Sequence, residues 1–181
     1  MFSSEGFKKE EKKEEDKQVL YYSEPILLTM NPESDIVNVI KRLSAAETDS
    51  FMKQVTEILR KSRNHYSWVG IYMVKDDSLV LRAFSGEQET EHTRIKIGEG
   101  ICSLAAQTGN TIMVPDVSRD LRYIACFPST KSEIVVPIKI DRRIVGEIDI
   151  DSDSLNVFTA EDKALLEEVA RVIAEKLEKK V

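Results

Sequence analysis

Two cysteines and a group of carboxylates are the residues of this chain best suited to chemistry. Cys126 lies in the stretch YIACFPSTKSEIVVPI, seven residues before Glu133 and an apolar run. Cys102 follows the segment GEGI at the expected start of a helix, a position that can lower the pKa of a thiol. Either cysteine alone is typical of a buried structural thiol. With a carboxylate cluster nearby, the two also fit a redox pair, in which one thiol becomes a sulfenic acid and the other forms a disulfide with it.

The carboxylates are brought together by the last two expected strands, SEIVVPIKI and RIVGEIDID. Isoleucine and valine alternate along both, which places their side chains on one face of a sheet. A three-residue loop lets the two apolar faces coincide, so that Ile140 faces Ile144. In the same register Glu133 faces Asp151. The opposite face then collects four acids, which are Glu133, Glu147, Asp149 and Asp151.

Like charges that face each other across a sheet destabilise it, and two interpretations of the acidic face are open. In the first, the face is solvated, and water and salt screen the repulsion. Most charge clusters are of this kind, so a solvated face is the default expectation. In the second, the acids form a site that binds a cation or an amino group, or that keeps one carboxyl protonated to act as an acid.

Other side chains give weaker signals. Trp68 and Tyr72 are four residues apart on a strand and therefore share a face, either as core residues or as the wall of a small-molecule pocket. His65 and His92 are the two histidines, and neither lies in a metal-ligand pattern. A phosphate-binding glycine loop and an HExxH motif are both missing from the sequence, so we expect no cofactor and no metal.

Composition restricts the class of protein further. The net charge of −6 argues against a nucleic-acid partner. The longest apolar runs are too short to span a membrane, so no membrane partner is expected. The N-terminal segment has no apolar stretch of the kind that a signal peptide needs, which predicts a cytoplasmic location. Two cysteines are too few for a disulfide framework.

The chain predicts a single α+β domain after a charged tail. Residues 1–18 contain five lysines and six acids, and we expect them to be disordered because they have little apolar surface to bury. Residues 19–181 form the domain, which begins with an extended segment. The loop over 117–131 is long enough to suggest a functional role. Periodicity predicts helices over 31–44, 48–63, 101–109 and 160–180, and strands over 67–74, 78–85, 92–97, 111–116, 132–140 and 143–151.

From residue 67 onward the sequence resembles a GAF domain, and more narrowly the free methionine-(R)-sulfoxide reductase branch of that family. The segments that carry the resemblance are SWVGIYMV, RIKIGEGIC, YIAC, SEIVVPI, IVGEIDIDS and FTAEDKALL. The resemblance implies a six-stranded antiparallel sheet, with helices packed on one face and a loop-covered pocket on the other. It also implies a homodimer.

The resemblance assigns roles to the candidate residues. Cys126 matches the nucleophile, and Cys102 matches a further cysteine that could resolve the sulfenic acid. Pocket aromatics match Trp68 and Tyr72. The carboxylates that hold the substrate amino group and assist at the sulfoxide oxygen match Glu133, Asp149 and Asp151.

Two departures weaken the enzyme interpretation. His92 stands where typical members carry the resolving cysteine, and Phe127 stands where an aspartate often follows the nucleophile. One expected function is therefore reduction of free L-methionine (R)-sulfoxide, with a thioredoxin-like reductant as partner. The alternative is a noncatalytic GAF module that binds a small molecule or acts as a sensor.

Overall fold

The computed structural model describes residues 32–124 and 126–179, and the tail and lead-in expected over 1–30 lie outside this part of the chain. The helices are α1 (Pro32–Leu43), α2 (Thr48–Ser62), α3 (Gly100–Thr108) and α4 (Ala160–Glu178). The strands are β1 (Trp68–Lys75), β2 (Ser78–Ser85), β3 (Arg94–Lys96), β4 (Ile112–Val114), β5 (Ser132–Ile140) and β6 (Arg143–Ser152). None of these helices is long and apolar enough to cross a bilayer.

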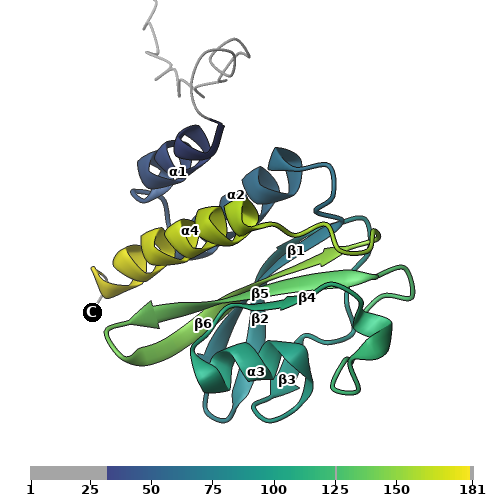
Figure 1. Ribbon diagram of the computed structural model, residues 1–181. Helices are drawn as coiled ribbons and strands as arrows, with labels where there is room; N and C mark the ends of the chain where they lie inside the picture. Colours follow the sequence, from purple (N-terminus) through teal and green to yellow (C-terminus); the bar gives the residue numbers. More distant parts are fainter. Residues whose placement is uncertain (1–31, 125, 180–181) are drawn as a thin grey trace, which may run out of the picture.

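The six strands form one antiparallel sheet in the order β3-β2-β1-β6-β5-β4. Helices α1, α2 and α4 pack on one face, and α3 lies on the other (Figure 1). The predicted α+β architecture is therefore confirmed. The two edge strands have only three residues each, which leaves little unpaired backbone for association with another sheet.

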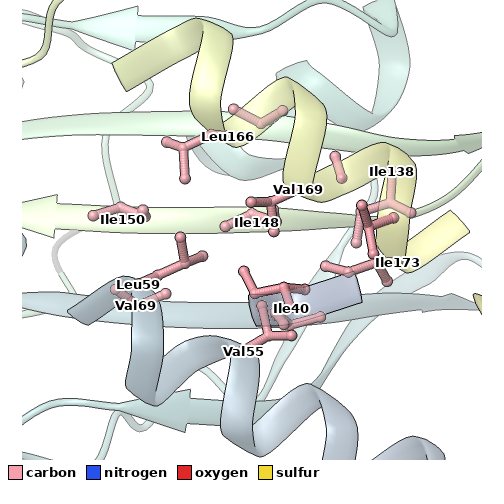
Figure 2. Packing of buried hydrophobic residues seen from close by; sticks show 14 of the residues in the cluster. Ile40, Val55, Leu59, Val69, Ile138, Ile148, Ile150, Leu166, Val169 and Ile173 are labelled. Atoms are coloured by element: carbon pink, nitrogen blue, oxygen red, sulfur yellow. The ribbon is translucent and has the colours of Figure 1, made fainter. Parts of the chain in front are cut away.

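The main hydrophobic core lies between the sheet and the three helices α1, α2 and α4. Alternation along β5 and β6 directs one set of side chains to this face, where Ile148 and Ile150 are fully buried. Figure 2 shows Ile148 beneath Val169 of α4, and Ile150 further along the same strand on the side of Leu59 of α2. Apolar side chains form most of this face, with Ser132 and Ser152 paired at one end of it, and the acids of the same strands are directed to the opposite face.

The register of β5 against β6 is as predicted over most of its length. Glu133 pairs with Asp151, and this pairing continues to Ile138, which faces Gly146. The predicted pair Ile140–Ile144 is wrong, because the register shifts by one residue between Ile138 and Lys139. Such a bulge leaves one residue of β6 unpaired and lets the strands close in a tighter turn.

Helix α4 begins with an N-cap at Thr159. The Thr159 side chain accepts from the Asp162 backbone N–H, and the Asp162 carboxylate accepts from the Thr159 backbone N–H at 2.9 Å. The Tyr66 hydroxyl also donates to Asp162, at 2.7 Å. His65 Nε2 lies 3.4 Å from the same carboxylate, so this histidine packs against the N-terminus of α4 and not in the candidate site.

On the opposite face, two glycines make room for Trp68. A Cβ atom at Gly70 would lie 2.3 Å from the indole ring, and one at Gly86 would lie 2.2 Å from it. Both separations are far below van der Waals contact. The indole itself is 3% exposed, so it has little freedom to move away. Phe84 stacks on the ring with a centroid separation of 6.0 Å.

The contact at Gly70 predicts that Gly70→Ala displaces the only tryptophan of the chain. We expect a loss of about 1–3 kcal/mol in unfolding free energy, which is typical of overpacking, together with a shift in tryptophan emission. Gly109→Ala is the control, because Gly109 ends α3 with a φ of 66° and its substitution strains backbone elsewhere. The control should lose stability with unchanged emission. An unshifted emission in Gly70→Ala would contradict the prediction.

Candidate functional site

The site is built on β6, which is paired with β1 on one side and β5 on the other. The register aligns Gly70 with Asp149, so that no side chain on β1 stands directly opposite this carboxylate. Trp68 is aligned with Asp151, which also faces Glu133 on β5. Three adjacent strands thus direct aromatic and acidic side chains to one small area of the face that α3 covers (Figure 1).

The expectation of a solvated acidic face is wrong. The four carboxylates, Glu133, Glu147, Asp149 and Asp151, are between 0 and 4% exposed. They are buried because α3 and the loop before β5 cover this side of the sheet, a long-range contact that strand periodicity does not reveal. Among the described residues, none of the four forms an ion pair with lysine, arginine or histidine.

Burial and mutual repulsion shift the acids toward their neutral forms. Burial raises the pKa of Asp149 to about 7, although the neighbouring Cys102 and Glu133 limit the rise. Burial, followed by the negative charge of Asp149, raises the pKa of Glu133, Glu147 and Asp151 well above the usual range. A cation or ammonium group placed among these acids would favour their charged forms.

Cys102 is in direct contact with this cluster. Its Sγ atom lies 3.4 Å from Asp149 Oδ2 and 3.6 Å from Glu133 Oε1, within hydrogen-bonding range for a thiol donor. Its position near the start of α3 does not lower the thiol pKa as expected. Burial, and then the charges of Asp149 and Glu133, raise that pKa well above the usual value, which outweighs the helix terminus.

Cys126 approaches the cluster from the loop that precedes β5. Its side chain is half-buried, and burial, followed by the charges of Asp149 and Asp151, raises the thiol pKa. Cys126, Cys102 and His92 line one cavity of about 10 Å³, which is room for about one water molecule. The two cysteines therefore meet at the same site, and the ligand-free protein holds both as neutral thiols.

The aromatic residues form a wall beside the acids. The ring centroids of Trp68 and Tyr72 are 6.5 Å apart, and the Tyr72 hydroxyl donates to the His92 carbonyl at 3.1 Å. A hollow of about 140 Å³ adjoins this wall, and Arg60, Trp68 and Asp151 are among the residues that line it. Trp68 and Asp151 are themselves almost completely buried, so they form the inner end of this hollow.

The structure brings all the predicted site residues together and adds one more. Cys102, Cys126, Trp68, Tyr72 and the predicted acids lie on one face of the sheet or on the segments that cover it. Phe127, which we did not predict as a site residue, packs on Trp68 with a centroid separation of 5.7 Å. The signal available in the sequence was its position directly after Cys126.

Comparison with known proteins places the chain in a family. The GAF domain model matches residues 47–177, which is most of the chain. The chain belongs to the GAF domain family. This GAF domain is 38% identical to "GAF domain-containing protein A" of Dictyostelium discoideum over 67% of the chain and 76% of the relative.

Within the family, this GAF domain is similar to proteins named free methionine-R-sulfoxide reductase, as the sequence motifs indicated. It is 32% identical to the one from Escherichia coli, over 78% of the chain and 88% of the relative. The structure of such a reductase from Neisseria meningitidis, solved in complex with its substrate, superposes with a TM-score of 0.76 at 31% identity. That match covers 84% of this chain and 96% of the other.

The buried acids predict a specific dependence of stability on pH. An acid with a higher pKa in the folded than in the unfolded chain stabilises the fold at low pH, and this contribution is lost as pH rises through the folded pKa. The wild-type unfolding free energy should therefore fall between about pH 5 and about pH 8, a range set by the ordinary carboxyl pKa of about 4 and by the pKa of about 7 for Asp149.

Glu147→Gln tests this dependence, because Glu147 is fully buried and has no hydrogen-bond partner for either carboxylate oxygen. Burial raises the pKa of Glu147, so we expect the variant to be more stable than wild type near pH 8 and to differ little from it near pH 5. Urea denaturation measures the difference. Glu175→Gln, at an exposed position of α4, should follow wild type. Parallel curves for Glu147→Gln and wild type would contradict the prediction.

Proposed function

We propose that this GAF domain reduces free L-methionine (R)-sulfoxide to methionine. The observation that carries the proposal is the meeting of two cysteines with a buried carboxylate cluster in one pocket. The similarity to reductases over most of their length supports the same activity. An activity on the free amino acid requires a group that recognises its ammonium, and the acids supply it.

Substrate binding offsets the electrostatic cost of the site. The ammonium group of the substrate enters between Asp149 and Asp151 and favours their ionised forms. The aromatic wall of Trp68 and Tyr72 holds the methyl and sulfur end, since sulfur and cationic groups both bind favourably to aromatic rings. The hollow beside Trp68 is the entry route in this proposal.

In the first chemical step, the sulfur of Cys126 attacks the sulfoxide sulfur. The sulfur–oxygen bond of the substrate breaks, oxygen passes to Cys126 as a sulfenic acid, and methionine leaves. The substrate is reduced by two electrons and Cys126 is oxidised by two. Burial and the charge of Asp149 raise the pKa of Glu133, so it can donate a proton to the sulfoxide oxygen as the bond breaks, and the resulting carboxylate takes up the proton that the Cys126 thiol loses.

In the second step, the Cys102 thiol attacks the sulfenic acid. A disulfide between Cys102 and Cys126 forms, and the oxygen leaves as water. His92 lies at the same cavity in the place of the usual resolving cysteine, so Cys102 takes over that role. A thioredoxin-like dithiol then reduces the disulfide and regenerates both thiols.

Turnover of the two substrate epimers tests this proposal. With dithiothreitol as reductant, wild type should form methionine from the free (R)-sulfoxide and much less from the (S)-sulfoxide. Cys126→Ser should fall to background. Cys102→Ser should keep its first turnover and lose thioredoxin-dependent cycling, because its sulfenic acid has no partner thiol. Methionine formation by wild type no faster than by Cys126→Ser would overturn the proposal.

The alternative is a noncatalytic module that binds a small molecule in the same pocket. The raised pKa of both cysteine thiols favours it, since a neutral thiol is a poor nucleophile. Such a module would keep the ammonium-binding acids and use the pocket only for recognition.

Calorimetry with Cys126→Ser separates binding from chemistry. We expect this variant to bind free methionine (R)-sulfoxide, and the further change Asp149→Asn to weaken binding by about 10-fold or more, the cost of one charge-assisted hydrogen bond. Ser129→Ala, on the rim of the hollow, serves as the control and should bind normally. Binding without turnover by wild type would favour the module, and unchanged affinity in Asp149→Asn would remove the acids from recognition.

A further inference from the structure

We propose that the floor of the pocket is a binding site for a thiophilic divalent cation such as Zn²⁺. The ligands are the Cys102 thiolate and the carboxylates of Glu133 and Asp149. The assignment rests on the positions of the ligand atoms and not on the proposed reductase activity, although the two would share Cys102, Glu133 and Asp149. The site has no sequence motif, because its three ligands come from three separate elements, α3, β5 and β6.

The spacing of the ligand atoms fits a tetrahedral metal. With a zinc–sulfur bond of about 2.3 Å and zinc–oxygen bonds of about 2.1 Å, sulfur and oxygen ligands lie about 3.6 Å apart in a tetrahedron. Cys102 Sγ lies 3.4 Å from Asp149 Oδ2 and 3.6 Å from Glu133 Oε1. One ligand atom from each of the three residues falls within 4.8 Å of the others. Only small movements are needed to close them on an ion.

Buried carboxylate oxygens without a hydrogen-bond partner are a second, independent indication of a cation site. Glu133 Oε2, Asp149 Oδ1 and Asp151 Oδ2 make no hydrogen bond. Glu147 is 0% exposed, neither of its oxygens has a hydrogen-bond partner, and Asp149 and Cys102 are the neighbours that act on it. Buried polar atoms are normally satisfied, and a buried carboxylate is costly unless it is paired or coordinates a metal.

The chemistry of the ligands selects the kind of cation. A thiolate with carboxylates suits a borderline-soft ion such as Zn²⁺ or Co²⁺, whereas Mg²⁺ and Ca²⁺ prefer sites made of oxygen alone. Cys126 lies outside this ligand set in the described residues. The proposal therefore assigns the two thiols different behaviour toward metals, although both line the same cavity.

Cobalt titration of the reduced, untagged full chain tests the site. We expect one equivalent of Co²⁺ to give a thiolate-to-cobalt charge-transfer band in the near ultraviolet, and Zn²⁺ to bleach it. Cys126→Ser should keep the band, and Cys102→Ser should lose it. Asp149→Asn should keep the thiol and weaken Co²⁺ binding by about 10-fold or more, which covers the case in which Cys102→Ser does not fold.

Several outcomes of the titration would contradict the metal site. A wild-type chain without the band, or a band that survives in Cys102→Ser and disappears in Cys126→Ser, would overturn the proposal. An excess of Mg²⁺ that bleaches the band would contradict the thiophilic assignment. If methionine formation also occurs, Zn²⁺ should inhibit it and a chelator restore it, because ion and substrate ammonium share Asp149. Reductase activity without the cobalt band would support the proposed function and exclude the metal site. A cobalt band without reductase activity would support the metal site and exclude the proposed function.

Discussion

The structure depends on the burial of four like-charged side chains on one face of an antiparallel sheet. Strand alternation makes this possible, because successive side chains of one strand point to opposite faces, so that the isoleucines lie on one face and the acids on the other. The helix-covered face provides the hydrophobic stabilisation, with Ile148 and Ile150 fully buried. The opposite face can then carry an arrangement that opposes folding. This separation explains how a domain of this size accommodates four buried carboxylates whose ionisation lowers the free energy of unfolding.

The state of the thiols follows from the state of the acids. Burial and neighbouring carboxylates raise the pKa of the Cys102 and Cys126 thiols and so favour their neutral forms. A positive group among the carboxylates reverses the sign of the local field and favours the thiolates. Ammonium and metal would both have this effect, but they differ in consequence. An ammonium leaves the sulfur lone pairs available, whereas a metal engages those of Cys102 directly.

The sequence predicted the features that depend on local periodicity, such as strand bounds and pairing. It did not predict burial that depends on segments distant in the chain. Strands 78–85 and 132–140 match their predicted bounds, and the pairing of Glu133 with Asp151 followed from side-chain parity alone. The bulge near Ile138 was missed because backbone geometry in a turn leaves no hydrophobic signature. Burial of the acids was missed because it depends on α3 and the loop before β5. Phe127 was missed for the same reason, since its contact with Trp68 joins distant segments.

In the proposed reductase, the placement of the acids and of Cys126 on different kinds of backbone has an evolutionary consequence. The acids of β6 lie on a strand paired on both sides, the part of a sheet that resists amide exchange most strongly. Cys126 lies in a connecting segment outside the ladders, where substitutions and changes of length are tolerated. If the proposed function holds, descendants of this chain can replace the nucleophile Cys126 while inheriting the acids that bind the ammonium. Such a pocket would change its chemistry more readily than the charge of its ligand.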